Sequence, residues 1–145
     1  TRGHVAQTPT LGLHQARIAR SGEEVTLICY GPMVDTCLEA AKEASQEGRK
    51  LEVIDVRSLS PLDMATVYES VRRTTRAIVV QEAPRTQGVG AEIAARLGEE
   101  LYYVMEAPVL RVTGWSTPYP PAKAEGEHIP DVDRILDAVD RSLAF

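Results

Sequence analysis

Cysteine, positive charge and long apolar runs are all scarce in this chain, and each shortage excludes a class of protein. The two cysteines, Cys29 and Cys37, have neither zinc-ligand nor CxxC spacing. Because disulfides are rare in the cytosol, we expect reduced thiols and a cytoplasmic protein. The net charge of −5 leaves no basic stripe for phosphates, so we expect no nucleic-acid partner. No apolar run approaches the ~18 residues that span a bilayer, so we expect no membrane contact.

Metal-binding and hydrolase motifs are also missing. The three histidines, His4, His14 and His128, share no helix, and none has a carboxylate at a spacing such as HExxH. We therefore expect exposed or capping histidines and no metal site. No serine lies in a G-x-S-x-G elbow, so a hydrolase triad has no nucleophile. These absences predict no catalytic residue and no cofactor bound by this chain itself.

What the chain does contain is a repeated pattern of apolar runs followed by amphipathic segments. Apolar content is 43% over 145 residues, which is enough for the core of one domain. The apolar, strand-like runs are residues 25–30, 51–56, 77–83 and 109–114. The helical segments are 31–48, 60–73, a third with Ile93, Leu97 and Leu101 in line, and 129–145. Such alternation predicts a mostly parallel sheet with helices on both faces.

Two local signals refine the pattern. Ser60 is expected to cap the second helix, with Pro61 in its first turn and Asp63 completing a capping-box-like S-x-x-D. Residues 16–20, the pair Ser21-Gly22 and the next run resemble a hairpin, which would add an antiparallel strand. The predicted fold is α/β, with three layers (α/β/α) around a mostly parallel sheet of about five strands and one antiparallel edge strand. Residues 1–10 are interpreted as a linker from a missing N-terminal domain, and 11–145 as the domain.

A turn with two glycines, Gly88 and Gly90, follows the third strand-like run. Such a turn can bind phosphate, because backbone N–H groups converge at a helix N-terminus. A dinucleotide fingerprint, however, needs a third glycine where this chain has Ile93, and Glu82 and Glu92 place negative charge on both sides. The favoured interpretation is that the glycines permit positive φ and a close helix–strand approach. Phosphate binding stays open as the alternative.

Only two titratable residues are well placed by the pattern. Asp55 and Glu82 lie at or near the C-terminal ends of predicted strands, where open α/β sheets bind ligands. Hydrogen bonding to the loop backbone is the plainer interpretation of both.

Three segments, in this order, carry a family resemblance: "VIDVRSLSPLD" (53–63), "EAPRTQGVGAEIA" (82–94) and "APVLRVTGWSTPYP" (107–120). Over residues 11–145 the chain resembles the C-terminal domain of the beta subunit of thiamine-diphosphate-dependent 2-oxo acid dehydrogenases. The same domain type closes transketolase. The resemblance implies an enzyme that decarboxylates pyruvate or a branched-chain 2-oxo acid, the latter slightly preferred, and passes the acyl group to lipoyl. Thiamine diphosphate and Mg would be held outside this chain.

The resemblance also implies a role in assembly. The domain would pack against a second beta subunit and the alpha subunits in a heterotetramer, and would contact the peripheral-subunit-binding domain of the acyltransferase core. The glycine turn, with Glu82, Arg85, Gly88 and Gly90, would be an interface loop. Phe145, in an apolar and acidic end, is the predicted docking residue for a basic partner. The alternatives are a stand-alone nucleotide-binding domain and the C-terminal domain of a transketolase-type sugar enzyme.

Overall fold

The computed structural model describes residues 11–145, and the predicted linker 1–10 lies outside the described residues. Five strands form one sheet in the order β1-β3-β2-β4-β5. The elements in chain order are β1 (Arg17–Arg20), β2 (Val25–Cys29), α1 (Met33–Gln46), β3 (Leu51–Asp55), α2 (Met64–Thr74), β4 (Ala77–Pro84), α3 (Val89–Leu101), β5 (Leu110–Gly114), the 3-10 turn η1 (Ala122–Ala124), α4 (Glu125–His128) and α5 (Val132–Leu143).

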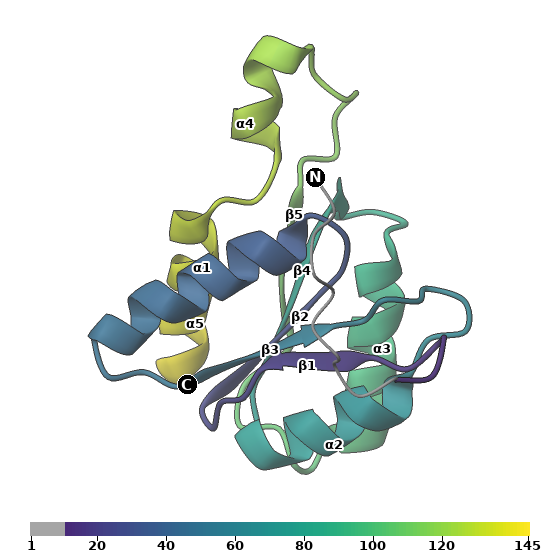
Figure 1. The fold of residues 1–145 in the computed structure, drawn as a ribbon, viewed down its shortest axis with the longest axis vertical. Helices are drawn as coiled ribbons and strands as arrows, with labels where there is room; N and C mark the ends of the chain where they lie inside the picture. The colour runs from purple at the N-terminus through teal and green to yellow at the C-terminus, as the bar shows by residue number, and fades with distance from the viewer. Residues whose placement is uncertain (1–10) are drawn as a thin grey trace, which may run out of the picture.

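The sheet has helices on both faces, as Figure 1 shows. On one face α1 and α5 enclose the core built around Leu27, Ile78 and Ile135. On the other face α2 and α3 enclose a second core around Ile54 and Leu97. The predicted three-layer α/β fold is therefore confirmed. The central strand β2 is buried along its whole length, as expected for a strand with helices on both sides.

The predicted antiparallel edge strand is present, but the predicted hairpin is wrong. β1 pairs antiparallel with β3, while both edges of β2 are taken by β3 and β4 in parallel. The connection between β1 and β2 instead crosses the start of β3, where the N–H groups of Glu23 and Glu24 donate to the Lys50 oxygen at 2.9 and 3.2 Å. A Cβ on Gly22 would lie 2.2 Å from the Leu51 carbonyl carbon. Only glycine fits this crossing.

The start of α2 also differs from the prediction. Asp63, not Ser60, is the N-cap, and its carboxylate accepts from the Thr66 N–H at 3.2 Å and from the Thr66 hydroxyl at 2.7 Å. The same carboxylate accepts from the Ala16 N–H at 2.9 Å, which ties the segment before β1 to the helix. Burial by itself raises the pKa of Asp63, but these bonds together with the Ala65 N–H bring it below the usual range.

One carboxylate is buried within the sheet. Glu52 of β3 has no exposed surface and accepts from the Arg73 guanidinium at 2.8 Å and from the Thr26 hydroxyl at 3.5 Å. Arg73 lies in the last turn of α2, so the pair joins the end of that helix to the sheet. The charge of Glu52 is thus committed to a structural contact.

Beyond β5 the chain leaves the three layers. The segment between β5 and α5 contains η1 and the short helix α4, which project beyond the sheet in Figure 1. The indole of Trp115 donates to the Glu127 oxygen at 3.0 Å, which closes the segment at its base. No helix within residues 11–145 has the length and apolar character needed to cross a bilayer.

Candidate functional site

The glycine turn joins β4 to α3 at the C-terminal end of the parallel strands. Gly88 is the N-cap of α3 and has no side chain to cap the helix. The backbone N–H groups in the first turn of a helix have no partner within the helix, so they can attract an anion if nothing else accepts from them. One of them, the N–H of Gly90, donates to Oε1 of Gln81 at 2.7 Å. Gln81 belongs to β4 and has no exposed surface.

The amide of Gln81 is fully used in this position. Its Oε1 also accepts from the Tyr30 hydroxyl at 3.2 Å, and its Nε2 donates to the oxygens of Pro84 at 2.9 Å and Ala83 at 3.3 Å. A neutral side chain therefore occupies the place that a phosphate would take. Gln81 was not among the predicted site residues. A glutamine inside an apolar strand is nevertheless a signal, because a buried amide needs hydrogen-bond partners.

The close approach predicted for the glycines is confirmed. A Cβ on Gly88 would lie 2.1 Å from Nε2 of Gln81, and a Cβ on Gly90 would lie 2.6 Å from its Oε1 and 2.9 Å from Cγ1 of Val79. The predicted positive φ is wrong. Gly88 has φ −77°, and Gln87 is the residue of this turn with positive φ, 64°. The glycines are needed because no side chain fits beside Gln81.

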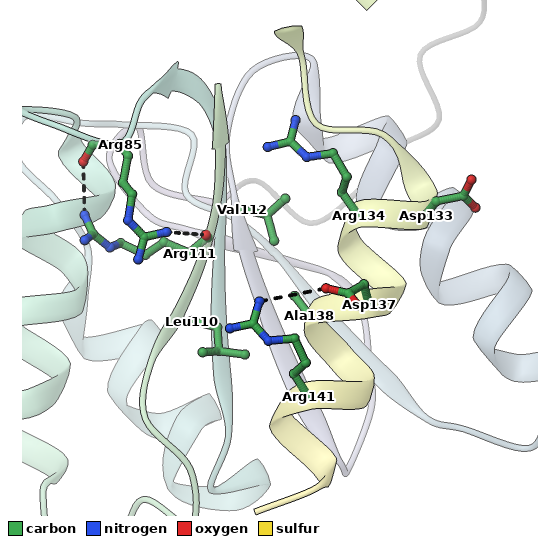
Figure 2. Close-up of a pocket in the computed structure, with 9 residues that line it drawn as sticks. All are labelled: Arg85, Leu110, Arg111, Val112, Asp133, Arg134, Asp137, Ala138 and Arg141. Carbon is green, nitrogen blue, oxygen red and sulfur yellow. Dashed lines mark hydrogen bonds and ion pairs between the residues drawn. The ribbon is translucent and has the colours of Figure 1, made fainter. Parts of the chain in front are cut away.

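The other predicted residues of the turn are Glu82 and Arg85. Glu82 is half-buried in β4, and Arg85 is exposed in the turn. The Arg85 guanidinium donates to the backbone oxygen of Arg111 in β5 at 3.3 Å, and the Arg111 guanidinium donates back to the Arg85 oxygen at 3.1 Å. Figure 2 shows this reciprocal pair across the edge strand. The turn is thereby fixed to β5.

Phe145 lies away from the turn. The Arg76 guanidinium donates to the Ser142 oxygen at 3.1 Å, which places the end of α5 beside the residue that precedes β4. The C-terminus is thus at the N-terminal edge of the parallel strands, opposite the glycine turn (Figure 1). The Phe145 side chain is 72% exposed. The structure therefore brings together Glu82, Arg85, Gly88 and Gly90 but not Phe145.

The remaining candidates make structural contacts. Asp55 forms an ion pair with Arg17 at 3.1 Å and accepts from the Arg57 N–H at 3.1 Å, as the plainer interpretation predicted. The Nδ1 atom of His14 lies 3.3 Å from the Ser58 hydroxyl. Within residues 11–145 there is no group of three His, Cys, Asp or Glu side chains that could hold a metal ion.

One histidine differs from the prediction of exposure. His128 is buried at 4% exposure, with its ring centroid 5.1 Å from that of Tyr119. It is the last residue of α4, and its Nε2 would lie 2.9 Å from a Cβ placed on Gly114 at the end of β5. The third, His4, lies outside the described residues.

Tyr30 and Tyr119 have raised pKa values. Burial, and then the charge of Glu82, raise the pKa of Tyr30. The hydrogen bond that Tyr119 donates to Glu125, with smaller effects of burial and of the Glu125 and Glu82 charges, raises the pKa of Tyr119 to about 12. Both hydroxyls therefore stay protonated at neutral pH and act as hydrogen-bond donors rather than as bases.

The cysteines are free, as predicted, and the structure shows that both are buried. The thiol of Cys29 donates to the Ile54 oxygen at 3.3 Å. A hydrogen bond with Cys37 and burial raise the pKa of Cys29, so this thiol is protonated and unreactive at neutral pH.

Comparison with known proteins agrees with this arrangement. Residues 14–135 match the family described as transketolase, C-terminal domain. The chain is 54% identical over 135 residues to the pyruvate dehydrogenase E1 component subunit beta of Leifsonia xyli, covering 93% of this chain and 40% of that protein. It is 49% identical to the 3-methyl-2-oxobutanoate dehydrogenase subunit beta of Mycobacterium tuberculosis, covering 93% and 38%. The chain thus spans about two fifths of the length of these relatives.

Solved structures also resemble the chain, among them the following two. A split gene transketolase, described as an inactive beta4 tetramer, has a TM-score of 0.81 and 27% identity, covering 97% of this chain and 45% of that one. A 2-oxoglutarate:ferredoxin oxidoreductase from Magnetococcus marinus has a TM-score of 0.56 at 16% identity, covering 88% and 19%. The second likeness concerns the fold alone.

Proposed function

Because this chain belongs to the family of transketolase C-terminal domains, we propose that it is the assembly and docking domain of the beta subunit of a 2-oxo acid dehydrogenase. The observation that carries the proposal is the identity of about half of all residues to two such beta subunits along 93% of the chain. The whole enzyme would decarboxylate pyruvate or a branched-chain 2-oxo acid and transfer the acyl group to lipoyl. The domain alone would catalyse neither step.

The site chemistry supports a non-catalytic role. Thiamine diphosphate bound through Mg needs oxygen ligands for the ion and donors for the diphosphate. The residues present do not fit this group, because Gln81 fills the turn at Gly88 and Gly90 and Asp55 is paired with Arg17. The cofactor would be held by the alpha subunit and by the other part of the beta subunit.

The bond between Gln81 and the Gly90 N–H also weakens the nucleotide-binding alternative, because a nucleotide site would need an open turn at Gly88. The transketolase-type alternative has the weaker similarity, 27% identity to the split gene transketolase against 54% to the pyruvate dehydrogenase beta subunit. Identities of 54% and 49% do not separate pyruvate from the branched-chain acids, because the proposed substrate contacts lie outside this chain.

The activity is tested by assembling the full-length beta subunit with its alpha subunit. The assembled protein should decarboxylate pyruvate or 3-methyl-2-oxobutanoate in the presence of thiamine diphosphate, Mg and a lipoyl acceptor. The 145-residue chain alone should give no turnover and, in calorimetric titrations, no binding of thiamine diphosphate or NAD. Micromolar binding of either cofactor to the chain alone would contradict the proposal.

We further propose that the docking surfaces lie at two ends of the domain. The turn with Glu82, Arg85, Gly88 and Gly90 would contact the alpha subunit or the second beta subunit. Phe145 would contact the basic peripheral-subunit-binding domain of the acyltransferase. An aromatic side chain that is 72% exposed in the free chain is the kind of residue that dominates an interface once it is covered.

Phe145→Ala tests the second contact. The substitution should weaken binding of the peripheral-subunit-binding domain about tenfold, or about 1.4 kcal/mol, because an aromatic anchor is lost. The fold should not change, since the buried face of α5 ends at Ser142. Surface-plasmon titration of the assembled enzyme measures the affinity. Tyr103→Ala, which removes a 97% exposed aromatic beyond α3, is the control. Equal affinities of both variants and the parent would place docking elsewhere.

A further inference from the structure

A groove of about 360 Å³ lies between the edge strand β5 and helix α5. The side chains around it are shown in Figure 2. Leu110, Val112 and Ala138 form its apolar part, and its lining otherwise holds four arginines and two aspartates, Arg85, Arg111, Arg134, Arg141, Asp133 and Asp137. The lining therefore has a formal charge of +2 in a chain of −5. Positive charge gathered in a groove attracts anions by focusing the local field.

The free edge of β5 is closed to an added strand. The carbonyl of Arg111 accepts from Arg85, and the carbonyl of Thr113 accepts from Arg134. A peptide that extended the sheet would need these carbonyls as acceptors. Because both are already bonded to guanidinium groups, the edge is protected. An occupant of the groove must therefore be recognised by the side chains.

The guanidinium groups have donors to spare. Arg134 uses Nη2 on the Thr113 oxygen and stacks over the Trp115 ring at 4.6 Å, but its Nη1 is buried and, within the described residues, has no hydrogen-bond partner. A guanidinium carries five N–H donors, and a buried donor without an acceptor is costly. Because Nη1 has no exposed surface in this arrangement, an oxyanion in the groove would supply the missing acceptor once the guanidinium turns toward it.

Arg141 is also weakly committed. Its guanidinium lies 3.8 Å from the Asp137 carboxylate, and both side chains are more than 60% exposed. Such an exposed pair contributes little, so Arg141 can turn from Asp137 to a ligand without a large loss. Arg85 and Arg111 lie together across β5 from α5, and each guanidinium donates to the backbone oxygen of the other residue (Figure 2). The donors assigned to an occupant are those of Arg134 and Arg141 on α5 and the remaining N–H groups of Arg85 on the opposite side of the groove.

We propose that this groove binds a small ligand bearing a phosphate or carboxylate group, held by Arg85, Arg134 and Arg141 against the apolar surface of Leu110 and Val112. Guanidinium forks match the geometry of both oxyanions and bind them with charge-assisted hydrogen bonds. The volume is that of a small-molecule site. The inference does not depend on the proposed dehydrogenase, because it rests on contacts within this chain.

The single tryptophan reports on the site. Trp115 stacks on Arg134, so an anion that draws the guanidinium toward the groove should change the indole fluorescence. The 145-residue chain is titrated with inorganic phosphate and, separately, with succinate, at constant ionic strength so that screening does not vary. A saturable change with either is expected. The tighter of the two identifies the oxyanion, and the absence of saturation with both would overturn the proposal.

Matched variants locate the binding. Arg141→Gln and Arg85→Gln should each weaken the phosphate or succinate affinity about tenfold, because each removes a charge-assisted contact. Arg96→Gln removes the same charge from an exposed ion pair on α3 and should leave the affinity unchanged. Circular dichroism checks that the variants fold. Equal losses in all three would mean that net charge, not the groove, attracts the anion.

The assembled enzyme gives the last arm of the experiment. The full beta subunit, assembled with its alpha subunit, is titrated with phosphate or succinate by calorimetry. The affinity should equal that of the 145-residue chain, and Arg141→Gln should weaken it by the same factor. A response that is present in the chain and lost on assembly would show that a partner subunit covers the groove. That result would overturn the proposal for the enzyme.

Discussion

Replacing Gly90 by alanine measures how tightly the glycine turn is packed against Gln81. The new Cβ would lie 2.6 Å from Oε1 of Gln81 and 2.9 Å from Cγ1 of Val79. Neither neighbour can retreat freely, because both are fully buried. A shift of Gln81 would also disturb its bonds to the Gly90 N–H, the Tyr30 hydroxyl and the Pro84 oxygen. The substitution therefore tests the contact that closes the anion site.

The expected loss of stability follows from three effects. Overpacking a buried position costs about 1–3 kcal/mol. Each hydrogen bond that Gln81 loses costs about 1 kcal/mol more. Alanine is better than glycine inside a helix by up to about 1 kcal/mol, which offsets part of the cost at position 90 of α3. The net destabilisation should be about 1–3 kcal/mol, or a fall in Tm of roughly 3–10 °C for a domain of this size. Valine in place of alanine should cost more.

Thermal melts followed by circular dichroism provide the assay, and the same helix provides a control. Gly98 lies in α3 as well, but a Cβ there would have no atom within 4 Å. Gly98→Ala should therefore leave Tm unchanged or raise it, since only the helix preference acts. If Gly90→Ala has the same Tm as Gly98→Ala, at or above that of the parent, then the turn tolerates a side chain and the argument from Gln81 fails.

Two further predictions concern ionisable groups. Asp63→Ala should destabilise the domain by about 1–2 kcal/mol at pH 7, because α2 loses its N-cap and Ala16 loses its acceptor. The folded pKa of Asp63 is lowered, so its ionised-state contribution is present above the unfolded pKa of about 3.9 and is lost as the pH falls through the folded value. Denaturant titrations of parent and variant should therefore converge in acid, and a difference independent of pH would contradict this. Tyr119 should titrate near pH 12, and Glu125→Ala, which removes the acceptor, should bring its pKa back toward 10. Carbon NMR of labelled tyrosine measures this, and an unchanged midpoint in the variant would refute the hydrogen bond as the cause.

The main strands, the four long helices and their layers follow from local patterns in the sequence. Periodicities of two kinds, apolar runs and amphipathic stripes, are local properties of the chain, and they specify which segments become strands and which faces of helices are buried. Spacing alone predicted that Ile93, Leu97 and Leu101 share one face of a helix, and all three are buried residues of α3. The three ordered segments that carried the family resemblance were equally readable without coordinates, and the family match confirms them.

Which strands pair with each other depends on contacts between segments far apart in the sequence. Strand 17–20 was expected to pair with its neighbour in sequence, but it pairs with β3, because β2 already has a parallel strand on each side. Helix capping depended on the same long-range contacts. Asp63 is the cap, and its carboxylate also holds the Ala16 N–H, a residue 47 positions away. A local sequence pattern cannot reveal a contact between residues so far apart in the chain.

The candidate site shows the same division. The sequence located the glycine turn and weighed packing against phosphate binding, but the decision lay with Gln81, a residue nine positions from Gly90 whose amide reaches the helix start. Phe145 and the turn were grouped by their predicted role, and the fold sets them at opposite ends of the sheet, since α5 runs back along it. Local sequence determines which conformations a segment prefers, whereas the partners of a buried polar group are set by which segments the packed core brings together.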